Sequence, residues 1–158
     1  MKVAWLALVA GIALPSGGCV QSAAPNAAGE GVAAAAAAIV AAFGRHDQEA
    51  YFALFDPEAT FVFYTTPQRL ENRAAYQQEW AKWERELGFR VRSCSSSDQR
   101  VQLIGDVAIF THSVLTEIST NEGESMLRER ETIVFHRRNG RWIAVHEHLS
   151  PQPEATAP

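Results

Sequence analysis

The stretch Glu129–Pro151, ERETIVFHRRNGRWIAVHEHLSP, decides the fold of this chain. It has the pattern of two strands joined by a tight turn. The segment Arg138-Asn139-Gly140 suits a three-residue loop with its glycine in the left-handed region. Such a loop pairs Phe135 with Ile143. Because side chains alternate along a strand, facing pairs share one face of the sheet.

This pairing predicts one apolar face and one polar, aromatic face. The apolar face needs a core to cover it, and the second is too rich in histidine, arginine and tryptophan for plain solvent-exposed surface. The first face carries Ile133, Phe135, Ile143, Val145 and Leu149, and the second carries Arg130, Thr132, Val134, His136, Trp142, His146 and His148.

The preceding sequence changes from a helical to an extended pattern. Apolar residues recur at helical spacing over 32–43 and 72–87, with a short helix capped by Asp47 between them. Three helices followed by long strands predict an α+β fold, a curved antiparallel or mixed sheet with the helices against its concave face. The strand-like runs are 59–64, 89–97, 100–104, 107–118, 126–136 and 141–150.

The N-terminus has the pattern of an export signal. Residues 3–14 are apolar but fall short of the about 20 residues that span a bilayer, which predicts a signal peptide over 1–18. Small residues before Cys19 resemble a bacterial lipoprotein signal, in which Cys19 is acylated. The alternative is ordinary cleavage after Ala24 or Ala28. We therefore expect an exported protein, lipid-anchored in the bacterial envelope or secreted.

Composition predicts the remaining organisation. Residues 19–30 suit a flexible tether, 31–151 a single domain and 152–158 a loose tail. The formal net charge is −4, and loss of the signal with Lys2 makes it −5, which argues against a nucleic-acid partner. If Cys19 is acylated, Cys94 is the only remaining thiol, so no internal disulfide can form.

The hairpin also carries a family resemblance. The pattern T-x-V-x-x-R-R-x-G-x-W-x-x-V-H-x-H-x-S over 132–150 resembles the SnoaL-like branch of the nuclear transport factor 2-like superfamily. It is also similar to the association domain of calcium/calmodulin-dependent protein kinase II. The resemblance extends back to about residue 33. It implies a cone-like sheet with a small-molecule pocket at its open end.

Neither set of polar residues from these relatives is carried over. The resemblance places Ile39 and Phe63 where ketosteroid isomerases have a tyrosine and an aspartate base, and neither residue can transfer a proton. Arginines that line the pocket of the kinase association domain correspond here to Ile133 and Leu149, and to either Thr111 or Ser113.

The expected pocket combines an apolar wall with two glutamates. Glu131 and Glu147 should face it side by side, and adjacent confined carboxylates can act as an acid and base pair. Our expectation is instead that they lie solvated at an exposed mouth. The pocket candidates are Phe61, Phe63, Tyr76, Trp80, Thr111, Ser113, Glu131, Ile133 and Glu147.

The polar face suggests a contact between two copies. His112, His146 and His148 on one face could ligate zinc, but no acidic or cysteine ligand joins them and Arg130 would repel a cation. With Trp142 on the same face, we favour a homodimer interface, and we expect neither a metal nor another cofactor.

The chain should bind a small molecule or mediate assembly. The alternative is an isomerase, cyclase or hydrolase that uses the glutamates or histidines.

Overall fold

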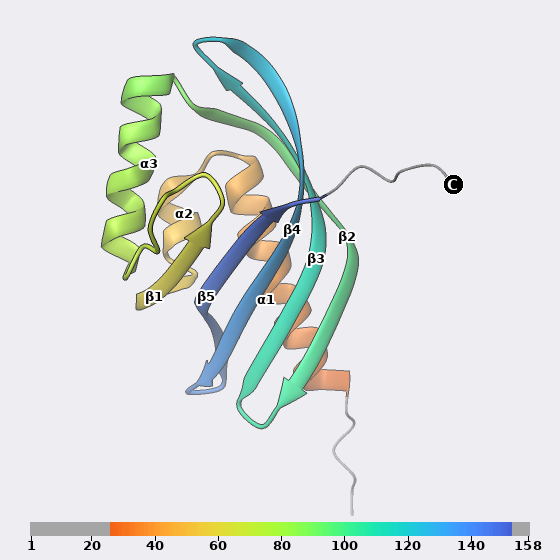
Figure 1. The fold of residues 1–158 in the computed structure, drawn as a ribbon. Helices are drawn as coiled ribbons and strands as arrows, with labels where there is room; N and C mark the ends of the chain where they lie inside the picture. Colours follow the sequence, from red (N-terminus) through yellow and green to blue (C-terminus); the bar gives the residue numbers. More distant parts are fainter. Residues whose placement is uncertain (1–25, 153–158) are drawn as a thin grey trace, which may run out of the picture.

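The structure is a computed structural model that describes residues 26–152, so the predicted signal peptide and Cys19 lie outside the described residues. Three helices and five strands make up the domain (Figure 1). They are α1 (Asn26–Gly44), α2 (Gln48–Phe52), β1 (Phe55–Phe63), α3 (Arg73–Leu87), β2 (Arg90–Ile104), β3 (Val107–Thr120), β4 (Gly123–Arg138) and β5 (Arg141–Pro151).

The strands form one curved sheet in the order β1-β5-β4-β3-β2. Strand β1 runs parallel to β5, and all other neighbours are antiparallel. The long strands bend around the helices, with α1 across the sheet and α3 beyond β1 (Figure 1). The predicted α+β class, with a curved mixed sheet and helices on its concave face, is confirmed.

Helix α2 begins, and helix α3 begins and ends, where the local chemistry predicts. Asp47 accepts a hydrogen bond from the Ala50 amide and caps α2. Asn72 caps α3, and Gly88 ends it with a φ of 64°, in the left-handed region that glycine tolerates. Helix α1 begins at Asn26, so residues 26–30, which the sequence assigned to a tether, are helical.

The predicted turn between β4 and β5 is wrong by one residue. Arg138 pairs with Arg141, so the loop is only Asn139 and Gly140, with φ values of 51° and 76°. Two consecutive left-handed residues are typical of a tight two-residue turn. The pairing therefore joins Phe135 to Ala144 instead of Ile143.

A second irregularity follows at Val145. The register shifts there, so that Ile133 pairs with Glu147 and Glu131 with Leu149. The extra residue restores the predicted alternation for the rest of β5. Glu131, Ile133, Glu147 and Leu149 therefore share the inward face as expected, although the two glutamates are diagonal neighbours and not direct partners.

The core fills the space between the concave face and the helices. Aromatic rings dominate it, and many of them meet at tilted or edge-to-face angles, such as Tyr76 on Phe61 at 4.8 Å. Apolar residues of α1 at Val32, Ala36 and Ile39 are buried against the sheet. Toward β4 and β5 the core gives way to polar groups and open space.

Candidate functional site

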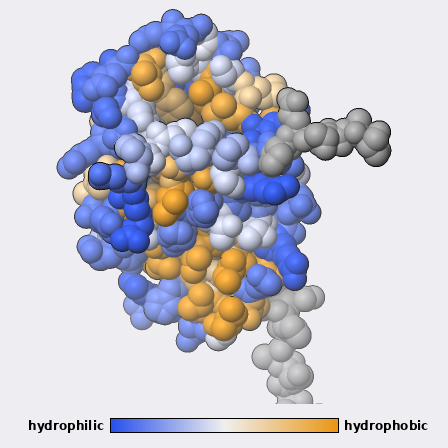
Figure 2. Space-filling model, viewed as in Figure 1, coloured by the Kyte–Doolittle hydropathy of each residue, from blue (hydrophilic) through white to orange (hydrophobic). Residues whose placement is uncertain are grey.

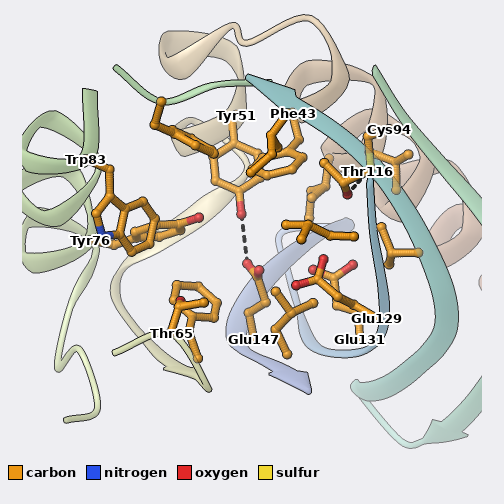
Figure 3. Close-up of a pocket in the computed structure, with 18 of the residues that line it drawn as sticks. Phe43, Tyr51, Thr65, Tyr76, Trp83, Cys94, Thr116, Glu129, Glu131 and Glu147 are labelled. Atoms are coloured by element: carbon orange, nitrogen blue, oxygen red, sulfur yellow. Dashed lines mark hydrogen bonds between the residues drawn. The ribbon is translucent and has the colours of Figure 1, made fainter. Parts of the chain in front are cut away.

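A cavity of about 250 Å³ lies between the inward face of the sheet, α1 and α3 (Figure 3). Its wall is mostly apolar. Its polar lining residues are Tyr51, Tyr76, Glu129, Glu131 and Glu147, with Thr65, Cys94, Thr116 and Thr120. The apolar lining residues are Ile39, Val40, Phe43, Phe63, Trp83, Leu87, Phe89, Val114, Ile118, Leu127 and Leu149.

Three glutamates from two neighbouring strands line one side of this cavity. Glu129 and Glu131 are alternate residues of β4, and Glu147 projects from the same face of β5. Their exposed fractions are 4%, 9% and 3%. The expectation of a solvated pair at an open mouth is therefore wrong, because these carboxyl groups are buried.

Glu147 is held by a tyrosine from the opposite wall. The Tyr51 hydroxyl donates a hydrogen bond to Glu147 Oε2 at 2.9 Å (Figure 3). The cap at Asp47 fixes the short helix α2 that carries Tyr51. Burial, followed by the nearby Glu147, raises the pKa of Tyr51 well above its ordinary value, so Tyr51 remains a donor.

Burial favours the protonated forms of Glu131 and Glu147. Burial raises the pKa of Glu131 to about 7, to which Glu129 also contributes. Burial, and then the charge of Glu131, raises the pKa of Glu147 well above its usual range. Two neighbouring buried carboxyl groups resist ionising together, so near neutral pH one is an acid and the other can be a base.

His112 contacts Glu131 from the side that faces away from the cavity. It is almost completely buried, and its Nε2 shares a hydrogen bond with Glu131 Oε2. Burial lowers the pKa of His112 to about 4. The imidazole is therefore neutral, and its tautomer decides whether Nε2 accepts a hydrogen bond from Glu131 or donates one to it. Since His112 does not line the cavity, it acts on a ligand only through Glu131.

Glu129 lies beside the pair and is bonded separately. The Tyr64 hydroxyl donates to Glu129 Oε1 at 2.8 Å. Burial raises the pKa of Glu129, which this hydrogen bond partly offsets. Tyr64 is 46% exposed, so this corner is the more open end of the carboxyl cluster.

Four of the nine predicted pocket residues line the cavity, namely Phe63, Tyr76, Glu131 and Glu147. Three others, Phe61, Trp80 and Ile133, are fully buried in the core beside it. Thr111 and Ser113 were wrongly placed in the pocket. They pair with Thr132 and Arg130 and share the outward face of the sheet.

The outward face lacks two of its predicted members. His112 points inward, so it cannot join His146 and His148 in one zinc site. Trp142 also points inward, against α1, where a Cβ on Gly31 would lie 3.2 Å from its ring. Arg130, His146 and His148 remain on the outward face, as predicted.

Sequence reasoning missed Tyr51, whose helical pattern places it in an ordinary core and whose polar partner is 96 residues away. His112 was a candidate on the outward face, and its contact with Glu131, 19 residues away, was missed. Within residues 26–152, no three His, Cys, Asp or Glu side chains are arranged to hold a metal ion. None of the helices described is long and apolar enough to cross a membrane.

Solved structures of the same fold come from several bacteria. A proposed dehydratase of the nuclear transport factor 2-like family from Streptomyces avermitilis is 22% identical, with a TM-score of 0.65 over 82% of this chain and 99% of that one. A ketosteroid isomerase-like protein from Erwinia carotovora atroseptica is 17% identical, with a TM-score of 0.66 over 78% and 96%.

A third structure, described as a calcium/calmodulin-dependent kinase II association domain from Exiguobacterium sibiricum, is 15% identical, with a TM-score of 0.68 over 83% of this chain and 98% of that one. No functionally curated protein matches this chain. The sequence model of the SnoaL-like domain matches residues 32–154. The chain therefore belongs to the SnoaL-like domain family.

Proposed function

We propose that the cavity binds a small, largely apolar and uncharged molecule, and that Glu131 and Glu147 transfer a proton to or from it. The observation that carries this proposal is the adjacency of two buried carboxyl groups in one apolar cavity. Burying such groups is costly unless they are protonated or bonded, and this arrangement gives one acid and one base near neutral pH.

The cavity wall defines the kind of ligand. A carboxylate or phosphate would meet three carboxyl groups and no lining arginine or lysine. A carbonyl or hydroxyl group could accept a hydrogen bond from a protonated glutamate, while the rest of the molecule replaces water against the rings of Phe43 and Trp83. A positioned acid or base typically contributes about 10²–10⁴-fold to a rate.

The chemistry differs in position from that of the ketosteroid isomerases. Ile39 and Phe63, which take the tyrosine and aspartate positions, both line the cavity but cannot transfer a proton. The proton-transferring groups lie instead on β4 and β5. Two similar structures are described as isomerase-like and as a dehydratase, and both descriptions are compatible with acid and base chemistry.

Deuterium exchange tests the proposal without a known substrate. The protein is incubated in D2O with a panel of cyclic ketones, and proton NMR follows loss of the hydrogens next to the carbonyl. We expect catalysed exchange with at least one ketone that is lost in Glu147→Gln and in Glu131→Gln. Glu124→Gln, on the exposed start of β4, is the matched control. Ketones that bind without exchange would leave a binding domain and refute the catalytic role.

The outward face supports a second proposal, that two copies associate through their sheets. Partly exposed Ile109, Val134 and Ile143 lie on this face, and Figure 2 shows apolar side chains gathered toward the turns at the lower end. Sedimentation should show a dimer that Val134→Lys converts to a monomer. Leu103→Lys, an exposed residue of the opposite face, should leave it dimeric. A monomeric parent protein would refute the proposal.

Export and anchoring are a separate proposal. It rests on the apolar run over 3–14 and on Gly17-Gly18-Cys19 after it. Cys19→Ser should release the protein from the membrane fraction of cells that express it. Equal processing and a soluble parent protein would contradict acylation and leave ordinary secretion.

A further inference from the structure

A row of polar side chains crosses the inward face of the sheet from its edge to the cavity. On neighbouring strands lie Ser96 of β2, His112 of β3, Glu131 of β4 and Glu147 of β5. His112 is directly opposite Glu131 in the strand pairing. Only the two glutamates line the cavity, so the row continues behind its wall.

Hydrogen bonds join this row continuously from Glu131 to the edge strand. His112 bonds Glu131 Oε2 through Nε2 and Ser96 Oγ through Nδ1, the latter at 2.7 Å. Gln99 Nε2 donates to the same Ser96 Oγ at 2.9 Å. The side chain of His112 is 0% exposed, so its Nδ1 has no direct contact with water and meets the Ser96 hydroxyl instead.

One arrangement of protons satisfies all of these contacts. The Ser96 oxygen can accept two hydrogen bonds, one from Gln99 and one from Nδ1–H of His112. Nε2 of His112 is then the acceptor for the proton on Glu131. The lowered pKa of His112 and the raised pKa of Glu131 agree with this neutral arrangement.

The far end of the row reaches solvent at an irregularity in β2. This strand is the last of the sheet, and its pairing with β3 is interrupted between Ser97 and Arg100. Asp98 has a φ of 50° there, and Gln99 is exposed. Ser96 is partly exposed, so its hydroxyl can exchange protons with water.

We propose that His112 and Ser96 form a relay that carries protons between the Glu131–Glu147 pair and water at the edge of β2. Glu131 gives its proton to Nε2 of His112, while the Nδ1 proton passes to Ser96 Oγ and Ser96 releases its own hydroxyl proton to water. One proton leaves the pair and one enters solvent, and the reverse steps restore the start.

The relay deepens the proposed function and rests on it. A bound apolar ligand fills the cavity and excludes water from the glutamates. A carboxyl group that has exchanged a proton with the ligand then needs another route to solvent. His112 and Ser96 supply that route without entering the cavity, so both are positioning and relay residues and not catalytic residues.

The exchange rate of the His112 Nδ1 proton with water tests the relay directly. It is measured by NMR on the full chain labelled with ¹⁵N-histidine. We expect Ser96→Ala to slow exchange by about a hundredfold or more, the lower limit for removing a proton-transferring group. Ser96→Thr, which keeps the hydroxyl, should restore the rate. Ser97→Ala, on the outward face of the same strand, should leave it unchanged.

An unchanged or faster exchange in Ser96→Ala would overturn the relay, and so would failure of Ser96→Thr to restore the rate. The measurement uses no ligand. A working relay in a protein that exchanges deuterium into no ketone would therefore refute the proposed function alone, and ketone exchange without a working relay would refute only the relay.

Discussion

The two faces of β3, β4 and β5 carry similar polar residues in opposite environments. On the inward face, Glu131, Glu147 and His112 are buried among aromatic rings. On the outward face, Arg130 and His148 are exposed. Consecutive polar residues of one strand, such as Arg130 and Glu131, thus differ in their access to water. The inward groups have shifted pKa values and fixed partners because water cannot solvate them.

The contrast between the two faces distinguishes a candidate chemical site from ordinary polar surface. A buried carboxyl group is an unfavourable way to stabilise a fold, and a cluster of them beside a cavity marks a candidate site. An exposed polar face adds little to stability, but it can form a contact with a partner. Substitutions at matched positions on the two faces should therefore have different consequences.

The largest difference between the two faces should be in the free energy of unfolding, when two neighbouring apolar residues of β4 are each replaced by alanine. Ile133 is 0% exposed and lies in the core, so Ile133→Ala should lower the free energy of unfolding by about 2–5 kcal/mol. Val134 faces outward and is partly exposed, so Val134→Ala should cost under about 1 kcal/mol in the monomer. Urea unfolding at low protein concentration measures both, and equal losses would contradict the assignment of faces.

The second prediction concerns how the free energy of unfolding changes with pH when Glu131 is replaced. Since the folded pKa of Glu131 is raised to about 7, the stability that its protonated form supplies is present below the ordinary value of 4.5 and is lost as the pH rises through 7. Glu131→Gln stays neutral. Its stability relative to the parent protein should therefore rise by about 1 kcal/mol per pH unit over this window.

Urea unfolding at several pH values between 5 and 8 gives this difference. His112, whose pKa is lowered by burial, acts in the opposite direction in both proteins and largely cancels in the comparison. Glu124→Gln, on the exposed part of β4, should give a flat difference. A flat difference for Glu131→Gln would show that this carboxyl group is ionised and solvated.

The smallest difference concerns single hydrogen bonds on the two faces. Tyr51→Phe removes the buried donor to Glu147 and should cost about 1–3 kcal/mol, because the acceptor is left without solvent. Thr60→Val removes a partly exposed bond to His146, which water can replace, and should cost under about 1 kcal/mol. Thermal unfolding compares them, and a larger loss for Thr60→Val would reverse the expected order.

The sequence predicted the inward glutamates through two errors that cancel. The turn has two loop residues instead of three, which inverts the alternation from Arg141 to Ala144 and moves Trp142 inward. The extra residue at Val145 inverts it again, so Glu147 faces as expected. A bulge has no strong composition signal, so the shift at Val145 could not be read from the apolar pattern. The dipeptide Asn139-Gly140, in contrast, is the usual signal of a two-residue turn.

Strand β3 shows a second reason why the sequence did not predict the whole site. Its inward residues from Ala108 to Thr116 and its outward residues from Val107 to Leu115 are about equally apolar. A strand that is apolar on both faces does not reveal which face is covered. His112 was therefore placed outward with Thr111 and Ser113 inward, and the relay became visible only when β2 and β4 were in place.

The helices were easier to predict because their signals are local. Caps at Asp47 and Asn72 and the glycine after α3 lie within a few residues of the ends that they define. The contact between Tyr51 and Glu147 joins residues 96 apart. No local pattern encodes such a distance, so the fold class could be predicted while the site could be predicted only in part.

The central claim is that Glu131 and Glu147 share a proton near neutral pH, and ¹³C NMR titration of the glutamate side-chain carboxyl groups tests it most directly. Glu131→Gln and Glu147→Gln assign the two signals. We predict that one carboxyl group titrates near pH 7 and that the other remains protonated above it. Titration of both groups near the ordinary glutamate value of 4.5 would contradict the buried pair and the acid and base role built on it.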